Sequence, residues 1–151
     1  MGKVTELLAQ LAGQHVYIDT NLFIYILENN PHYFDVASEI LTAVEAGQFI
    51  AYTGDVTVTE VLVKPYQSDN LLLVAQFKAF FAMDDFITVK PHTTEAFHLC
   101  AEIRGKYGVK FVYALHYATA LQAGCQFLIT NDKRFRSVMG GLEIKAVKDL
   151  I

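Results

Sequence analysis

Two short segments place acidic, hydroxyl and amide side chains at points where an apolar run ends. Asp19-Thr-Asn follows the β-branched run 15–18, and Thr-Asn-Asp132 follows the run 127–129. In both, strand-like spacing stops at side chains that can bind a cation or a phosphate. Ligands of α/β proteins collect at the carboxyl ends of strands, so the two turns predict one shared acidic pocket. The alternative interpretation is that each Asp merely caps the helix or turn that follows it.

The apolar spacing alternates between strand-like and helical along the chain. It predicts strands at 15–18, 49–53, 86–89 and 127–129, and allows a fifth at 142–147. Helices are predicted at 4–11, 22–27, 34–44, from a Thr cap after Asp55 to just before Pro65, from a Ser68-Asp69 cap to 80, at 95–106 and at 112–123. Alternating strands and helices imply a parallel sheet covered on both faces. We expect a single domain over residues 1–151, in which the N-terminal helix within 1–13 packs on its own core.

Composition favours a folded globule with a large core. Of 151 residues 53% are hydrophobic and 19% are charged, which argues against disorder. No apolar run approaches the roughly 20 residues that cross a bilayer, and the N-terminus lacks a signal-peptide core. We therefore expect a soluble cytoplasmic protein. Cys100 and Cys125 lie in apolar settings without metal-site spacing, and reduced core thiols are expected.

Charge is unevenly distributed around a net value of −4. Residues 1–100 hold four basic and twelve acidic side chains, whereas residues 101–151 hold eight basic and four acidic ones. Such a basic segment either contacts phosphates around an acidic site or is a solvated face. Its principal members are Arg104, Lys106, Lys110, Lys133, Arg134 and Arg136.

Four segments, taken in order and spacing, carry a family resemblance. They are Asp19-Thr-Asn-Leu-Phe, Thr59-Glu60-Val-Leu, Ala114-Leu-His-Tyr-Ala-Thr-Ala-Leu and Leu128-Ile-Thr-Asn-Asp132-Lys-Arg-Phe. Together they resemble the PIN domain, particularly the toxin-type (VapC-like) ribonucleases of bacterial toxin–antitoxin pairs. The resemblance covers roughly residues 15–147. It implies a three-layer α/β sandwich with a central parallel sheet of four to five strands.

The resemblance also implies an activity. The acidic residues of such domains meet at the carboxyl edge of the sheet, bind Mg²⁺ or Mn²⁺ and hydrolyse RNA. Asp19, Glu60 and Asp132 fall on three of the four acidic positions, as catalytic and metal-binding residues. A hard divalent ion prefers carboxylate oxygens, makes hydroxide from a bound water and offsets charge on the phosphate. Supporting or phosphate-contacting roles are expected for Thr20, Asn21, Thr130, Asn131, Lys133 and Arg134. The implied partners are RNA, a small antitoxin protein and a second copy of the chain.

Position 113 departs from the family pattern, which has Asp where this chain has Tyr113. A phenol is neutral at pH 7 and bulkier than a carboxylate, so metal binding should be weakened. Three interpretations remain open. The site retains weak metal-dependent activity through the other carboxylates, or the chain is a degenerate nuclease that binds RNA or protein, or the residue is an isolate-specific change from Asp in an active enzyme.

Other residues receive structural interpretations. His116 lies on the same helical side as Tyr113, and we interpret it as packed or hydrogen-bonded and leave it outside the site. Asp55 is interpreted as a helix-start residue. An unrelated receiver-type α/β domain would need a phosphate-acceptor Asp at a central strand and a later Lys at a strand end, and neither is evident.

Overall fold

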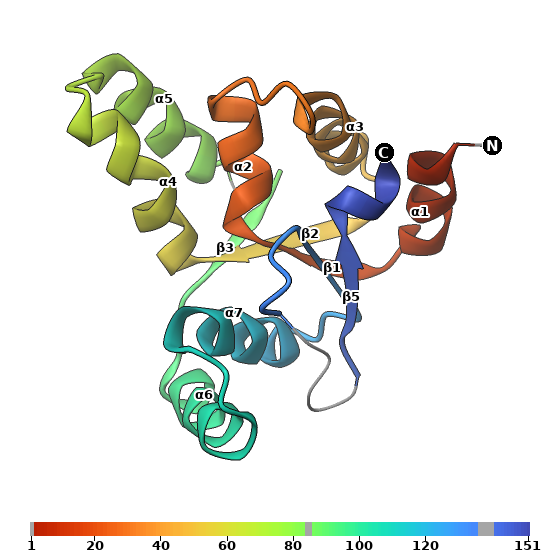
Figure 1. Ribbon diagram of the computed structural model, residues 1–151, viewed down its shortest axis with the longest axis vertical. Coiled ribbons are helices and arrows are strands. Elements are labelled where there is room, and N and C mark those ends of the chain that lie inside the picture. The colour runs from red at the N-terminus through yellow and green to blue at the C-terminus, as the bar shows by residue number, and fades with distance from the viewer. Residues whose placement is uncertain (1, 84–85, 136–140) are drawn as a thin grey trace.

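A computed structural model describes residues 2–83, 86–135 and 141–151, and Figure 1 shows how its helices and strands are arranged. In chain order the elements are α1 (Lys3–Leu11), β1 (His15–Ile18), α2 (Thr20–Leu27), α3 (Phe34–Glu45), β2 (Ile50–Gly54), α4 (Asp55–Gln67), α5 (Leu71–Phe81), β3 (Thr88–Lys90), α6 (Thr94–Tyr107), α7 (Phe111–Gln122), β4 (Phe127–Thr130), β5 (Glu143–Ala146) and the short 3-10 helix η1 (Val147–Leu150). The predicted alternation of strands and helices is confirmed, including the fifth strand.

The strands form one parallel sheet in the order β3-β2-β1-β4-β5. Val16 of β1 pairs with Ala51 of β2 on one side and with Phe127 of β4 on the other. The chain leaves β1 towards β2 and β3 and later returns to β4 on the opposite side of β1. This reversal of strand order lies between β1 and β4, and such a switch point leaves a crevice at the carboxyl ends of the two strands.

Helices cover both faces of the sheet, as predicted. Helices α1 to α5 lie on one face and α6 and α7 on the other (Figure 1). Side chains alternate along β1, so Val16 and Ile18 enter the first core whereas Tyr17 enters the second. Leu7 and Leu11 of α1 are buried in the first core, which confirms that the N-terminal helix packs on its own domain.

Two helix boundaries differ from the prediction. Helix α4 begins at Asp55 without a side-chain cap and continues through Pro65 to Gln67. Pro65 lies in the last turn, where its missing N–H costs a single hydrogen bond, and its ring is buried. Helix α5 is capped by Asn70, whose side chain accepts a hydrogen bond from Leu73 N at 3.2 Å. The expected Ser68-Asp69 cap was therefore wrong.

The remaining sequence expectations concern membrane-spanning helices, the two cysteines and Asp55. In the described ranges, none of the helices combines the length and the apolar character that a membrane crossing requires. Cys100 and Cys125 are buried free thiols, as predicted. Burial raises the pKa of Cys125 to about 12, so its thiol stays protonated at neutral pH. Asp55 is the first residue of α4, as predicted.

Candidate active site

The predicted acidic residues come from three elements that end or begin at the carboxyl edge of the sheet. Asp19 follows β1 directly and Asp132 follows β4 after one intervening residue. Glu60 lies in the second turn of α4, which begins immediately after β2, and Tyr113 lies in the first turn of α7. Adjacent β1 and β4 therefore bring residues more than a hundred positions apart in the sequence to one edge.

Asp19 is almost completely buried, with 6% of its surface exposed. Its Oδ1 accepts a hydrogen bond from Thr20 N at 2.8 Å, and its Oδ2 accepts one from Thr130 Oγ1 at 2.7 Å. Asp19 is thus the N-cap of α2, as the capping interpretation predicted, and its second oxygen also accepts a hydrogen bond from the end of β4. Burial raises the pKa of Asp19, although His116 and the Thr130 hydrogen bond act in the opposite direction.

One ring nitrogen of His116 lies close to the carboxylates of both Glu60 and Asp19. His116 Nε2 lies 3.0 Å from Glu60 Oε1 and 3.7 Å from Asp19 Oδ1. Its other ring nitrogen, Nδ1, lies 2.6 Å from the Tyr17 hydroxyl. Burial raises the pKa of Tyr17 well above its usual value. The Glu60 carboxylate only accepts hydrogen bonds, so His116 Nε2 is the donor to it, and in a neutral ring of that tautomer Nδ1 accepts from the Tyr17 hydroxyl. Burial acts to raise the pKa of Glu60, but hydrogen bonds from His116 and Thr20 outweigh it and lower the pKa.

His116 is the residue that sequence reasoning left outside the site. It is packed and hydrogen-bonded, as interpreted, with only 1% of its surface exposed. Its position nevertheless joins the two acidic residues. The sequence feature that could have indicated a site role for His116 is its three-residue spacing from Tyr113, which places both side chains on one side of α7.

Buried threonines fix the first turns of α2 and α4 against each other. Thr20 Oγ1 donates to Glu60 Oε1 at 2.7 Å. Thr57 Oγ1 lies 2.7 Å from Thr53 Oγ1, which in turn donates to the Ile18 carbonyl oxygen at 2.8 Å. The position of Glu60 is therefore set by the ends of β1 and β2.

Asp132 has a different partner. Arg134 Nε lies 2.9 Å from Asp132 Oδ1, and Arg134 Nη2 lies 2.7 Å from Oδ2. The side-chain hydrogen bond from Arg134 is the main reason why the pKa of Asp132 is lowered. The structure therefore brings Asp19 and Glu60 together, while both carboxylate oxygens of Asp132 are bound by a neighbouring guanidinium.

Tyr113 lies over this ion pair. The Arg134 guanidinium carbon is 4.5 Å from the centroid of the Tyr113 ring, and the Phe135 ring packs edge-on at 5.2 Å. Burial, followed by the charge of Asp132, raises the pKa of Tyr113, so the phenol is neutral at pH 7. It supplies an aromatic face where the family pattern would supply a charge.

The oxygens near Asp19 and Glu60 could hold a divalent ion through two carboxylates. Within residues 2–83, 86–135 and 141–151, no three His, Cys, Asp or Glu side chains are grouped so that they could hold a metal. Two carboxylates, Asp19 and Glu60, do converge, and Mg²⁺ commonly uses one or two carboxylates and keeps several waters. Asn21 Oδ1 is buried and has no hydrogen-bond partner among the described residues. Asn21 Nδ2 contacts Thr130 Oγ1 at 3.4 Å, and the same hydroxyl donates to Asp19, so this amide lies close to the Asp19 carboxylate. These oxygens fit an ion that is bound by two protein carboxylates better than one that is bound by three.

The predicted supporting residues divide into two groups. Thr20 and Thr130 bind the acidic side chains directly, as described above. Asn131 and Lys133 lie in the loop after β4, beside Asn21, and line an adjacent groove. Of the basic residues singled out in the sequence, Lys106 is paired with Glu102 and Arg104 lies over Phe111. Arg136 lies outside the described residues.

A comparison with known families decides the classification. The PIN domain profile matches residues 16–140 of this chain. The chain belongs to the PIN domain family. No curated protein matches it at a significant level.

Solved structures with the same fold include bacterial toxins. A VapBC2 complex from Rickettsia felis bound to a DNA fragment from its promoter is 14% identical, with a TM-score of 0.66, covering 87% of this chain and 98% of the other. A toxin–antitoxin complex from Klebsiella pneumoniae is 20% identical, with a TM-score of 0.61 and coverages of 84% and 94%. VapC20 of Mycobacterium tuberculosis, a toxin that cleaves the sarcin–ricin loop, is 14% identical, with a TM-score of 0.61 and coverages of 75% and 86%. At these identities the likeness shows that this PIN domain shares their fold.

Proposed function

We propose that this chain is a toxin-type PIN ribonuclease that binds RNA at the carboxyl edge of its sheet and hydrolyses it slowly because of Tyr113. The observation that carries the proposal is the convergence of Asp19 and Glu60 at His116, with oxygens 3.7 and 3.0 Å from one ring nitrogen. A buried carboxylate (Asp19) and a half-buried one (Glu60) held this close at a strand-order reversal are suited to a cation and a phosphate. Membership of the PIN family supports the same conclusion.

Asp19 and Glu60 would hold Mg²⁺ or Mn²⁺. A bound ion of this kind lowers the pKa of a water and offsets negative charge that develops on the phosphate. The chain's own residues position these carboxylates: Thr130 and Thr20 hold Asp19, and His116 and Thr20 hold Glu60. Asp132, held by Arg134, would contribute only if that ion pair opened.

The decisive experiment compares RNA cleavage by the chain and by Tyr113→Asp, each with Mn²⁺ and with EDTA. Tyr113→Asn is the matched control because it has the size of Asp without the charge. We expect Tyr113→Asp to cleave at least ~10-fold faster than the other two proteins, corresponding to ~1.4 kcal/mol of barrier. EDTA should stop all cleavage, and Asp19→Asn in the Tyr113→Asp background should abolish it. Equal rates for all three proteins would show that Tyr113 does not limit the reaction.

A second candidate function is favoured by the Asp132–Arg134 pair. The Arg134 guanidinium binds both carboxylate oxygens of Asp132, which the family resemblance would place on the metal ion. With that carboxylate occupied, the domain is suited to binding RNA without cutting it. Absence of cleavage by Tyr113→Asp, combined with retained RNA binding, would select this function over the ribonuclease.

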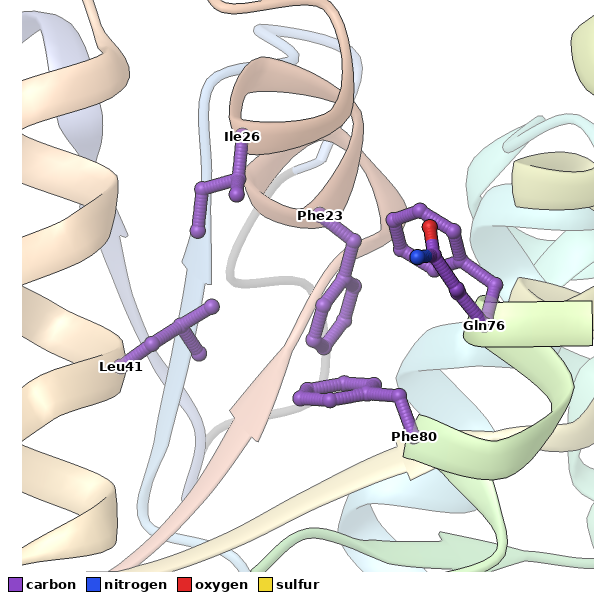
Figure 2. Close-up of a pocket in the computed structure, with 6 residues that line it drawn as sticks. Phe23, Ile26, Leu41, Gln76 and Phe80 are labelled. Carbon is purple, nitrogen blue, oxygen red and sulfur yellow. The ribbon is translucent and has the colours of Figure 1, made fainter. Parts of the chain in front are cut away.

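We also propose a protein partner of the antitoxin kind, which two of the similar structures contain. An apolar pocket of about 190 Å³ would accept its side chains. Figure 2 shows that the pocket lies between α2, α3 and α5, with the Phe23 and Phe80 rings at its centre. Its lining residues are Phe23, Ile26, Leu41, Gln76, Phe77 and Phe80.

The partner proposal is tested by co-expression with a candidate antitoxin, meaning a small protein from a gene adjacent to that of this chain, followed by size-exclusion chromatography. Gln76→Arg places a charge at the exposed rim of the pocket and should abolish the complex. Gln10→Arg, an equally exposed change on α1, is the control and should leave the complex intact. Light scattering on the chain alone would test the homodimer that the resemblance implies.

A further inference from the structure

A second groove, with a volume of about 650 Å³, lies beside the acidic residues. Its walls come from α2, from the segment that enters α3, from the loop after β4 and from η1. We call it the tyrosine–lysine groove and define it by Tyr25, Tyr33, Asn131, Lys133 and Lys148. Asn21, Asp132 and Arg134 also line it, so the groove lies next to the residues of the candidate active site.

Two tyrosine rings lie against each other at a tilt in this groove. The ring centroids of Tyr25 and Tyr33 are 4.8 Å apart, with an angle of 30° between the ring planes. Asn131 holds the pair in place, because its Nδ2 donates to the Tyr25 hydroxyl at 3.0 Å while its Oδ1 accepts from Lys148 N at 2.8 Å. The aromatic surface is therefore fixed before any ligand arrives, which reduces the entropy lost on binding.

Two of the three cations that line the groove are unpaired in the part of the chain that the structure describes. Lys133 and Lys148 are exposed, and within the described ranges neither takes part in an ion pair. Arg134 also lines the groove, but Asp132 offsets its charge. An excess of positive charge beside a fixed aromatic pair suits a ligand that carries both an anionic group and a flat ring.

We propose that the tyrosine–lysine groove binds a nucleotide of single-stranded RNA adjacent to the phosphodiester at Asp19 and Glu60. Its base stacks on the tyrosine pair and its phosphate lies between the two lysines. The inference rests on the proposed function and adds to it the site that holds the flanking nucleotide. Stacking accepts any base because each has a π-face, so the groove supplies affinity with little sequence preference.

The test measures binding of a short fluorescent single-stranded RNA by anisotropy in EDTA, where cleavage is stopped. Tyr33→Ala should weaken binding by about 5- to 150-fold, the range for loss of one stacked base. Tyr33→Phe keeps the ring and should bind like the wild type. The double variant Lys133→Gln with Lys148→Gln should make the slope of log affinity against log salt concentration less steep by about 1.4. Each lysine–phosphate contact on a single strand contributes ~0.7 to that slope.

The chain offers a matched control. Tyr66 on α4 and Lys78 on α5 form another exposed tyrosine–lysine pair, with Lys78 Nζ 5.9 Å from the centroid of the Tyr66 ring. Tyr66→Ala with Lys78→Gln removes the same chemical groups away from the groove and should leave binding unchanged. Unfolding temperatures of all variants confirm that each is folded, and the exposed lysine variants keep the test valid if Tyr33→Ala is unstable.

The outcomes separate this inference from the proposed function. Wild-type affinity in the lysine double variant and in a folded Tyr33→Ala would overturn the groove assignment while leaving RNA binding intact. No binding of RNA by the wild-type chain would overturn both. An oligoglutamate peptide that displaces RNA equally from wild type and Tyr33→Ala would show that binding depends on charge and not on the tyrosine pair, which also refutes the assignment.

Discussion

Replacing Tyr17 by phenylalanine removes one oxygen atom from the buried centre of the site. Tyr17 is 0% exposed, and its hydroxyl lies 2.6 Å from Nδ1 of His116, which is itself 1% exposed. Water cannot replace the lost donor without entering the core, so Nδ1 would remain buried without its partner. Leaving a buried acceptor unsatisfied costs about 1–3 kcal/mol. For a chain of this length, ~2 kcal/mol corresponds to a fall of about 4–8 °C in the unfolding temperature.

Tyr117→Phe is the matched control for this prediction. Tyr117 is equally buried, at 2% exposed, but its hydroxyl has no hydrogen-bond partner among the described residues. Removing that hydroxyl should leave the unfolding temperature unchanged or raise it slightly, because an unsatisfied buried group is lost. Thermal unfolding of both variants by circular dichroism makes the comparison. If Tyr17→Phe unfolds at the wild-type temperature, or if Tyr117→Phe is the less stable of the two, the Tyr17–His116 hydrogen bond does not stabilise the site as argued.

Three further predictions concern the elements that surround the site. Gly54→Ala should lower stability by about 1–3 kcal/mol, measured by urea unfolding, because the added methyl would lie 2.5 Å from the Tyr17 hydroxyl. Leu11→Ala should cost about 2–5 kcal/mol in the same assay, since Leu11 is 0% exposed; a value below 1 kcal/mol would show that α1 is not part of the core. The pKa of Asp132 is lowered by Arg134, so this pair contributes stability above the unfolded pKa and loses it as pH falls through the lower folded value. The unfolding temperatures of wild type and Arg134→Gln should therefore differ at pH 7 and begin to converge only below about pH 4; a difference that stays constant as the pH falls further would contradict the assignment.

The sequence determined the elements whose signals are local. Apolar spacing set β1 and β4, and Gly108 ended α6 in the left-handed conformation that glycine adopts without strain. It also supplied the four ordered segments that carry the family resemblance, and the PIN domain profile match agrees with them. Local signals failed at Pro65, where burial of the ring outweighed one lost hydrogen bond, and at Ser68-Asp69, where the neighbouring Asn70 took the capping role.

Only the tertiary structure decided how the site residues are paired. His116 joins Glu60 to Tyr17 because α7 packs across the sheet beside β1, and no local pattern encodes a contact between residues 99 positions apart. The pairing of Asp132 with Arg134 depends on the course of the loop after β4 and on the Tyr113 ring against which the guanidinium lies. The sequence therefore established which chemical groups are present, whereas the packing of α4 and α7 against the sheet established which of those groups meet.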